Sequence, residues 1–361
     1  MKIIKLYEHK ANTGGIVNFQ LDLEKYYEYS QNEYFYFRTG KVRNSRFLSN
    51  SLIRWFDLAL SYLIFPFYLM IINPDLIEIN TTLIRKSYYR DKMYFNIFNF
   101  LFSKRKTLLF IHGWNESFYD SIISMEKNKA VNYFNSYNSI IVLANSFSNR
   151  LKSIGVDQTQ ISVITTGIDL ATFEKRKRIV SKIDSILFLS RMEEEKGIVD
   201  FINAIPLILN YDKNIIFNVA GDGSFLSEAK NHEISKTYSE NINFHGYIKG
   251  EEKIKLLKSS TVYVFPSYHG EGCPVSVLEA MASELPIIYT NVGAMKELLL
   301  DGINGICIHP RDPKAIAKSV IDLITNRLVM KKIGEANKKM IKEKFDLRKI
   351  FSRIEDIYHN A

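Results

Sequence analysis

Short strand-like runs rich in valine, isoleucine and phenylalanine alternate with helical patterns along the whole sequence. In chain order the runs are 2–8, 76–80, 107–113, 139–145 and 161–167, and then 185–190, 215–221, 242–246, 261–267, 286–290 and 305–310. Strands of a parallel sheet look like this because helices cover both faces of the sheet. The pattern therefore predicts an α/β chain with doubly wound parallel sheets, and its two series predict two domains.

The length of the chain agrees with two domains, since 361 residues are many for a single hydrophobic core. The break is expected within residues 165–182, where a turn at Gly167 is followed by a basic stretch without periodicity. We place the N-terminal domain at residues 1–165 and the C-terminal domain at 166–345.

Composition indicates a folded protein of a reducing compartment. The chain is 46% hydrophobic and 24% charged, which excludes a disordered or fibrous protein. Cys273 and Cys307 provide no disulfide framework, although one pair between them is the alternative. Met1 leads directly into a strand-like run rather than a secretory signal, so we expect a cytoplasmic protein.

The N-terminal half is basic and aromatic. Residues 1–170 hold 20 Lys and Arg against 14 Asp and Glu, and 31 of the 47 aromatic residues. Such a surface suits nucleic acid, acidic sugars or an anionic membrane, whereas an aromatic core with solvated lysines explains the same composition. Leu58–Ile72 is shorter than the ~20 residues of a spanning helix and contains Pro66, so we expect a buried or interfacial helix.

Polar and glycine residues follow the predicted strands, at the edge where open α/β sheets bind ligands. They are Gly14-Gly15, His112 to Trp114, Arg191 with Lys196, Gly221 to Gly223, Tyr247, and the segment 265–290. Each has an ordinary explanation when taken alone: a turn, a hydrogen-bonded histidine at a strand end, or a solvated charge cluster with the neighbouring glutamates.

The segment 265–290 predicts an anion site next to two carboxylates. A helix beginning at Pro274 leaves the N–H groups of residues 275–277 free to bind a diphosphate. Glu279 then lies roughly 7–8 Å along the helix, about the span from a diphosphate to a ribose. Glu271 lies on the other side of the phosphates, where a sugar would be attached. The alternative is a capping box from Ser276 to Glu279.

Together these residues resemble the family 4 retaining glycosyltransferases. The resemblance is carried by Glu271 and Glu279 within "HGEGCPVSVLEAMASELPII", and by matching segments at 14–15, 111–114, 165–173, 190–197, 220–224, 244–248 and 291–308. It implies the GT-B architecture, in which two Rossmann-like domains face each other across a cleft. It further implies an acceptor-side domain at 1–165, a nucleotide-sugar domain at 166–345, and a helix at 346–361 that packs back on the N-terminal domain.

The resemblance also implies the roles of four catalytic residues. Arg191 and Lys196 would bind the donor diphosphate and stabilise it as it leaves. His112 would lie beside the transferred sugar, and Glu271 would hold the hydroxyls of that sugar. The remaining donor-binding positions are Gly15, Gly221, Tyr247, Ile248, Cys273, Pro274, Val275 and Glu279.

The reaction expected from this resemblance needs neither metal nor cofactor, because the chain has no Asp-x-Asp motif and fixed cations meet the charge of the leaving group. The donor would be a nucleotide sugar, by family frequency a UDP-sugar, transferred with retention. The acceptor would be a glycan, free or linked to a polyprenyl diphosphate, in capsule, O-antigen or other surface polysaccharide synthesis. The enzyme would then visit the inner face of the cytoplasmic membrane.

Other functional classes share part of this pattern. A GT-B protein that only binds nucleotide sugars, or epimerises or hydrolyses them, would use the same pocket. An oxidoreductase is disfavoured because no G-x-G-x-x-G follows a strand. A nucleic-acid binder would use the net charge of +9, but no motif supports it, and we expect no nucleic-acid partner.

Overall fold

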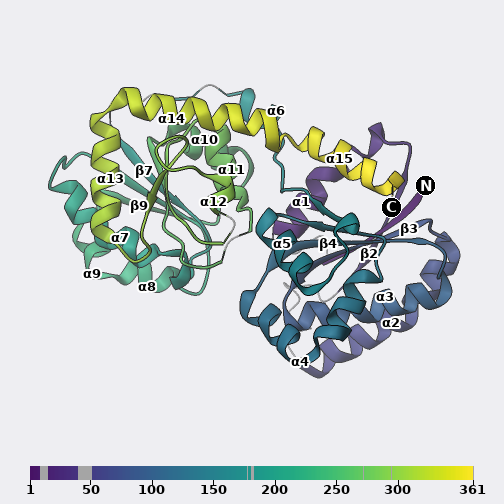
Figure 1. Ribbon diagram of the computed structural model, residues 1–361. Coiled ribbons are helices and arrows are strands. Elements are labelled where there is room, and N and C mark those ends of the chain that lie inside the picture. Colours follow the sequence, from purple (N-terminus) through teal and green to yellow (C-terminus); the bar gives the residue numbers. More distant parts are fainter. Residues whose placement is uncertain are drawn as a thin grey trace. The chain divides into compact units, whose positions relative to one another are not determined.

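The computed structural model describes residues 1–8, 15–39, 51–176, 178–179, 183–270, 272–293 and 295–360, with backbone only for 51–54. The chain divides into two compact units (Figure 1). Unit 1 comprises Met1–Gly167 and Leu347–Ala361, and unit 2 comprises Ile168–Asp346. Each unit contains a six-stranded sheet.

The sheet of unit 1 is parallel throughout, with the strand order β2-β1-β3-β4-β5-β6. Its strands are β1 (Lys2–Tyr7), β2 (Glu33–Arg38), β3 (Leu76–Leu83), β4 (Lys106–Trp114), β5 (Ser139–Val142) and β6 (Ile161–Val163). The helices are α1 (Gly15–Glu24), α2 (Ser51–Ile72), α3 (Arg85–Leu101), α4 (Glu116–Asn135), α5 (Asn145–Ile154) and α15 (Leu347–Asn360).

The sheet of unit 2 is also parallel, with the order β12-β11-β10-β7-β8-β9. Its strands are β7 (Ser185–Leu189), β8 (Ile216–Ala220), β9 (Ile242–Gly246), β10 (Val262–Phe265), β11 (Ile287–Thr290) and β12 (Ile306–Ile308). The helices are α6 (Leu170–Glu174), α7 (Ile198–Leu209), α8 (Leu226–Asn231), α9 (Glu233–Thr237), α10 (Gly250–Ser259), α11 (Val275–Ala282), α12 (Met295–Leu298), α13 (Pro313–Thr325) and α14 (Arg327–Met340).

Helices cover both faces of the unit 2 sheet. Ile186 and Phe188 of β7 belong to the hydrophobic cluster that contains residues of α7 and α13. Leu187, between them in sequence, belongs to a second cluster with residues of α10 and α11. Successive side chains of a strand point to opposite faces, so both faces of this strand are buried. The predicted doubly wound α/β fold is confirmed.

Every predicted strand-like run contains an observed strand, but one strand escaped prediction. It is β2, with the sequence EYFYFR, which pairs with β1 at the edge of the unit 1 sheet. Five of its six residues are half-buried, so neither face of β2 is clearly buried or clearly exposed. Its sequence therefore lacks the alternation of apolar and polar residues by which a strand is recognised.

The apolar segment before β3 forms a longer helix than the sequence indicated. α2 runs for 22 residues and continues through Pro66. Only 11% of the window Trp55–Ile72 is buried, so of the two predicted alternatives, a buried or an interfacial helix, the buried one was wrong. By length and composition alone, α2 is also the one helix among the described residues that could cross a membrane.

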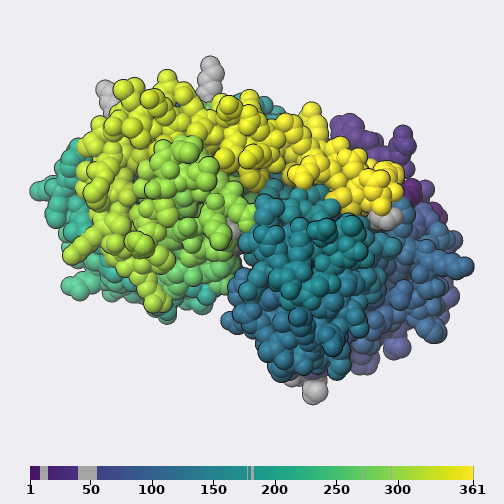
Figure 2. Space-filling model, in the orientation of Figure 1, coloured from purple at the N-terminus to yellow at the C-terminus, as the bar shows by residue number. Residues whose placement is uncertain are grey.

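The C-terminal helix α15 is part of unit 1. Its buried residues are Leu347, Ile350, Phe351, Ile354 and Tyr358. The carboxylate of Glu355 accepts hydrogen bonds from Ser30 at 2.6 Å and from Asn32 at 3.1 Å. Figure 2 shows the yellow C-terminal helix beside purple residues from the beginning of the chain. Unit 1 is therefore assembled from two separate stretches of sequence.

Candidate functional site

The carboxyl ends of β7 and β10 mark the place where the connections of the unit 2 sheet change direction. From β7 the chain proceeds to β8 and β9 on one side, and then returns to β10 on the other. Ligands of doubly wound sheets bind at such a reversal. Arg191 and Lys196 follow β7, and the segment leading to α11 follows β10, so both predicted phosphate-binding elements flank this point.

Backbone hydrogen bonds join the loops at this edge into one structure. The N–H of Met192 donates to the carbonyl of Asp222 at 3.0 Å, and the N–H of Gly221 donates to the carbonyl of Gly246 at 2.7 Å. The N–H of Tyr268 donates to the carbonyl of Glu195 at 3.0 Å. The loops after β7, β8, β9 and β10 are thus held in fixed positions by their backbones.

Two glycines make this close packing feasible. Gly221 has φ of +139°, and a Cβ there would lie 1.8 Å from the carbonyl oxygen of Ser190. Gly197 has φ of +76°, and a Cβ there would lie 2.3 Å from the carbonyl oxygen of Pro266. Any larger residue would push the loops apart. Gly221 therefore allows the loop after β8 to approach the loop after β7 closely.

The two predicted cations differ in exposure. Arg191 is exposed and makes no side-chain hydrogen bond within the described residues, whereas only 5% of Lys196 is exposed. The neighbouring glutamates have other partners: Glu193 accepts a hydrogen bond from Ser224 at 2.6 Å, and Glu195 lies 3.1 Å from His269. The hydrogen bond from Ser224 lowers the pKa of Glu193. The loop therefore has fixed side-chain contacts, while Arg191, Glu194 and Glu195 remain exposed to solvent.

Helix α11 begins one residue later than predicted. Pro274 is its N-cap, with ψ of 121°, and Val275 is the first helical residue. The carbonyl of Pro274 accepts hydrogen bonds from the N–H groups of Val277 at 3.1 Å and Leu278 at 3.3 Å. The prediction that Val277 has a free N–H was therefore wrong. Among the described residues, the N–H groups of residues 275 and 276 have no backbone partner.

The alternative capping box does not form. The N-cap makes no side-chain hydrogen bond. The hydroxyl of Ser276 lies 3.0 Å from the hydroxyl of Tyr263, whose own contact with the carbonyl of Leu189 fixes it at the end of β7. Ser276 thus ties the start of α11 to the carboxyl end of β7.

Glu279 is a buried carboxylate with a fixed partner. It is 8% exposed, and its Oε1 lies 2.5 Å from Nζ of Lys253 in α10. A carboxylate buried to this degree requires such a cation.

The other predicted donor-binding residues of unit 2 lie at different depths. Tyr247 is 55% exposed, whereas Ile248 is 5% exposed and belongs to the core. A ligand would therefore contact Ile248 through its backbone. Cys273 and Val275 are half-buried and pack against the same core. Glu271 lies outside the described residues.

Unit 1 contributes Gly15 and His112 to the predicted set. Gly15 is the first residue of α1, and open space surrounds the position of a Cβ there. His112 lies near the end of β4, where its ring stacks on Phe110 with centroids 3.9 Å apart. Nε2 of His112 lies 2.7 Å from Oδ1 of Asn80.

The hydrogen bonds of Asn80 determine which nitrogen of His112 carries the proton. The amide nitrogen of Asn80 donates a hydrogen bond to Glu78 Oε1 at 2.7 Å. An ionised carboxylate only accepts hydrogen bonds, so the atom facing it must be this nitrogen and not the amide oxygen. Oδ1 of Asn80 accepts a hydrogen bond from Gln20 at 2.6 Å and is left to accept from His112 as well. Nε2 of His112 is therefore the donor, and Nδ1 is an acceptor. Burial, with a smaller contribution from Lys5, lowers the pKa of His112 to about 3, so the ring is neutral near pH 7.

Sequence reasoning missed the polar network behind His112. Lys5 and Glu78 are partners in the pairing of β1 with β3, are at most 2% exposed, and lie 3.5 Å apart. The hydroxyl of Tyr358 in α15 donates to the second oxygen of Glu78. Burial lowers the pKa of Lys5 despite this partner. A signal existed, because two polar residues interrupt the apolar run LIEIN.

Comparison with known proteins identifies the larger part of unit 2. Residues 171–340 match the family described as Glycosyl transferases group 1. This segment is therefore similar to the group 1 glycosyltransferases, and it holds the predicted residues Arg191, Lys196 and Glu279.

Curated proteins that are similar to this chain are also named glycosyltransferases. An uncharacterized glycosyltransferase of Methanocaldococcus jannaschii is 27% identical over 81% of this chain and 78% of its own length. The UDP-Gal:alpha-D-GlcNAc-diphosphoundecaprenol alpha-1,3-galactosyltransferase of Escherichia coli is 26% identical over 58% of this chain and 56% of its own length. Seven of the curated relatives, the Escherichia coli enzyme among them, are matched over only 47 to 63% of their own length.

Solved structures extend the likeness in fold to the whole chain. Anabaena HepE in complex with UDP superimposes with a TM-score of 0.77 at 17% identity, covering 100% of both chains. The sucrose-phosphate synthase of Thermosynechococcus elongatus superimposes with a TM-score of 0.77 at 16% identity, covering 99% of this chain and 98% of its own. Both units thus have the fold of GT-B glycosyltransferases.

Proposed function

We propose that the protein is a retaining, metal-independent hexosyltransferase. It transfers a sugar from a UDP-sugar to a hydroxyl of a glycan linked to a polyprenyl diphosphate, in the synthesis of a surface polysaccharide. The proposal rests on Arg191 and Lys196 after β7 and on the start of α11 after β10. These two elements flank the point where the connections of the sheet change direction, in the segment that matches the group 1 glycosyltransferases. Such an arrangement suits a diphosphate.

The donor and acceptor in this proposal are supported by named relatives. HepE has been solved with UDP and with UDP-glucose. The name of the Escherichia coli relative specifies a UDP-sugar and a diphosphoundecaprenol acceptor, and another relative is a capsular polysaccharide glycosyltransferase of Staphylococcus aureus.

In the proposed reaction, the protein meets the charge that develops on the departing diphosphate. Arg191, Lys196 and the N–H groups at the start of α11 supply fixed positive charge and donors there, which acts without reorganisation in the transition state. The anomeric carbon loses its bond to the diphosphate and gains one to the acceptor oxygen on the same face. The proton of the acceptor hydroxyl passes to the departing diphosphate.

The proposed roles of the remaining residues follow from their chemistry. Nδ1 of His112, which the network of Asn80 leaves unprotonated, accepts a hydrogen bond from a hydroxyl of the transferred sugar. Glu279 accepts hydrogen bonds from the ribose, with Lys253 holding its carboxylate in place. We assign Glu271 to the sugar hydroxyls on the basis of the motif in the sequence.

A thermal-shift screen of UDP, GDP and ADP, followed by transfer assays, tests this function. A ligand at 100 times its Kd adds about 2.7 kcal/mol to the folded state, so we expect UDP to raise Tm by several degrees and GDP and ADP to raise it less. Transfer from a UDP-hexose to polyprenyl diphosphate-linked glycans should exceed donor hydrolysis and persist in EDTA.

Several outcomes of these assays would contradict the proposal. Equal Tm shifts with all three nucleotides would remove the UDP assignment. A strict requirement for a divalent cation in the transfer step would remove the metal-independent mechanism. Hydrolysis that matches the rate with acceptors would favour a nucleotide-sugar hydrolase.

A further inference from the structure

Helix α2 exposes an apolar face where a helix of a soluble protein is normally polar. Its buried positions form a narrow row at four-residue spacing, Ser61, Phe65 and Leu69. The exposed positions within residues 55–72, where the structure describes the side chains of α2, are all apolar: Trp55, Phe56, Ala59, Leu60, Leu63, Ile64, Phe67, Met70 and Ile71. An exposed apolar area of this length marks an interaction surface.

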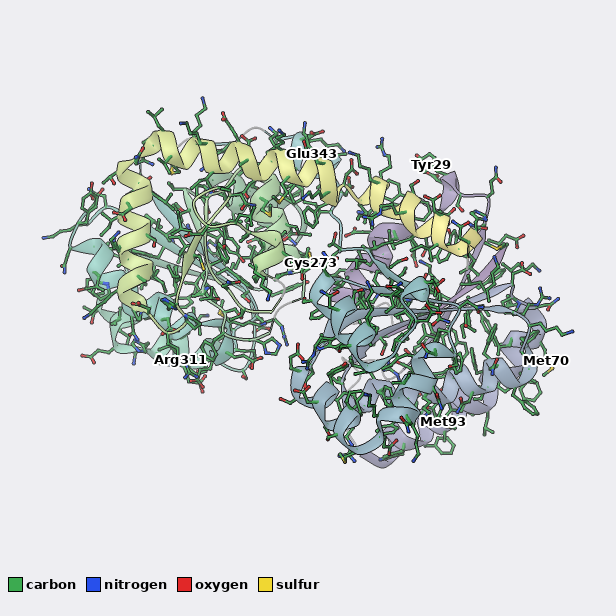
Figure 3. The ribbon with its side chains drawn as sticks, viewed as in Figure 1. Tyr29, Met70, Met93, Cys273, Arg311 and Glu343 are labelled. Carbon is green, nitrogen blue, oxygen red and sulfur yellow. The ribbon has the colours of Figure 1, made fainter. Side chains whose placement is uncertain are left out.

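Helix α3 extends this surface. The hydroxyls of Ser61 and Tyr94 lie 2.7 Å apart, which joins α2 to α3. Beyond this seam α3 exposes Met93 at 48% and Phe100 at 88%. Figure 3 shows the labelled side chains of Met70 and Met93 at the surface of unit 1. The exposed face of α2 and these residues of α3 together are called the α2 face below.

The charges around the α2 face favour a lipid surface over a protein partner. Asp57 is the one charged residue between Trp55 and Ile72, and it is paired with Arg38 at 2.7 Å. Arg85, Lys86 and Lys104, near the two ends of α3, are exposed and have no ion-pair partner among the described residues. Unpaired cations beside an uncharged apolar face match the charge distribution of an anionic bilayer surface.

The contacts of α2 also indicate how it meets the bilayer. Phe65 and Leu69 are 0% exposed, and Tyr62 donates to the backbone carbonyl of Arg90 at 3.2 Å. A spanning helix would have to give up these contacts with the rest of unit 1. We propose that the α2 face lies flat in the headgroup region of an anionic membrane and holds unit 1 on the bilayer. This binding is independent of the donor chemistry, and it brings unit 1 to the membrane where a lipid-linked acceptor would reside.

Vesicle binding by the full chain without any donor tests this proposal. Vesicles of phosphatidylcholine with 30% phosphatidylglycerol are compared with pure phosphatidylcholine at low and high salt. The chain should sediment with the anionic vesicles, and salt should weaken this binding by removing the attraction of Arg85, Lys86 and Lys104. The triple variant Leu63→Gln, Phe67→Gln, Ile71→Gln should bind at least 100-fold more weakly.

A matched control changes exposed apolar residues of unit 2. The triple variant Leu300→Gln, Leu328→Gln, Val329→Gln removes side chains that are 48%, 74% and 38% exposed, and it should bind vesicles like the wild type. The Tm and the UDP affinity of both triple variants are also measured. Values equal to those of the wild type show that the fold and donor binding are intact, so that any loss of vesicle binding is due to the α2 face.

Tryptophan fluorescence gives a second, independent measurement. The chain has two tryptophans, of which Trp55 is 73% exposed and Trp114 is 8% exposed. Anionic vesicles should shift the emission of the wild type to shorter wavelength, and Trp55→Phe should abolish that shift. Equal vesicle binding by the α2 triple variant, or an unshifted Trp55 in vesicle-bound protein, would overturn the proposal. A third outcome would also overturn it: the wild type is a dimer and does not bind vesicles, whereas the α2 triple variant is a monomer. The α2 face would then be a dimer interface.

Discussion

Unit 1 and unit 2 share a six-stranded parallel sheet, but they distribute apolar side chains differently. The contrast is clearest between two apolar helices that each contain a proline, α7 with Pro206 and α2 with Pro66. Seven of the 12 residues of α7 are buried, whereas α2 exposes most of its apolar side chains. An apolar helix therefore belongs to the core in unit 2, whereas an apolar helix of unit 1 lies largely at the surface.

The interiors differ as well. Unit 1 places Lys5 opposite Glu78 in the middle of its sheet, while two of the buried charges of unit 2, Lys196 and Glu279, lie beyond the ends of strands. A buried ion pair contributes little net stability, since desolvation offsets the attraction. We infer that Lys5 and Glu78, which break the usual pattern of burial in unit 1, mark a functional position.

The largest expected effect tests the contrast between the two helices. Phe201→Ala in α7 should lower the free energy of unfolding of unit 2 by about 3–5 kcal/mol, because the ring is 1% exposed. Phe67→Ala in α2, where the ring is 64% exposed, should change that of unit 1 by less than about 0.5 kcal/mol. Urea unfolding of both variants measures this. Comparable losses would mean that the α2 face is covered in the free protein.

The next effect concerns the strand ends of unit 2. Lys196→Ala should lower the kcat/KM of transfer about 10²–10³-fold, or about 2.7–4 kcal/mol, because a fixed cation for the leaving group is lost. Lys213→Ala is the control, since this exposed lysine precedes β8 and thus lies away from the carboxyl ends of the strands. Steady-state kinetics with the best UDP-sugar distinguish the two variants. An unimpaired Lys196→Ala variant would exclude this lysine from the reaction.

The buried histidine of unit 1 predicts a pH effect of intermediate size. His112 has a folded pKa of about 3, below the unfolded value of about 6.5, so near pH 5 the unfolded chain binds a proton that the folded protein does not. Its contribution to stability is therefore present above pH 6.5 and declines as the pH falls, by about 2 kcal/mol at pH 5.

Urea unfolding at pH 7 and pH 5 measures this contribution. His112→Gln should lose less stability than the wild type between the two pH values. His309→Gln, which removes an exposed histidine of unit 2, should lose as much as the wild type. If the His112 variant retains the full pH dependence, His112 is not held neutral in the folded state.

The smallest effect compares two similar pairs. Asn80 accepts from His112 in unit 1, and Asn218 lies 2.8 Å from His245 in unit 2. Asn80→Ala should lower kcat about tenfold, or about 1.4 kcal/mol, because His112 is no longer held in one tautomer. Its affinity for UDP, which lacks the sugar, should not change.

Asn218→Ala is the matched control and should leave kcat within about twofold of the wild type. Calorimetry with UDP and initial rates with the UDP-sugar give the two quantities. A parallel loss of UDP affinity and kcat in Asn80→Ala would indicate a disturbed fold rather than a positioning role.

Local pattern was sufficient to predict most of the fold, because buried parallel strands have a strong apolar signal. It failed for β2, whose aromatic residues are half-buried, and at Pro66, where tertiary contacts of Phe65 and Leu69 sustain the helix. Pro274 was placed one residue inside α11, although its carbonyl caps the helix. Exposure of α2 was beyond prediction, because hydrophobicity does not reveal what a side chain contacts.

The polar residues around His112 show a different limit. Glu78 and Asn80 are visible in the sequence as polar interruptions of a strand, but their partners are distant along the chain. Lys5, Gln20 and Tyr358 meet them only through the sheet order and the return of α15. Spacing along a sequence contains no information about such long-range hydrogen bonds.

The membership of α15 in unit 1 has a consequence for the order of folding during synthesis. Unit 2 is one continuous segment, Ile168–Asp346, and can close as soon as it leaves the ribosome. Most of unit 1 is synthesised first, but it cannot complete its fold at that stage. Glu78 has no hydrogen bond from the hydroxyl of Tyr358 until α15 has been synthesised. Contacts so distant in sequence form slowly. The residues of unit 1 up to Gly167 are therefore synthesised well before the helix that completes the unit, and they wait for α15 while the whole of unit 2 is made.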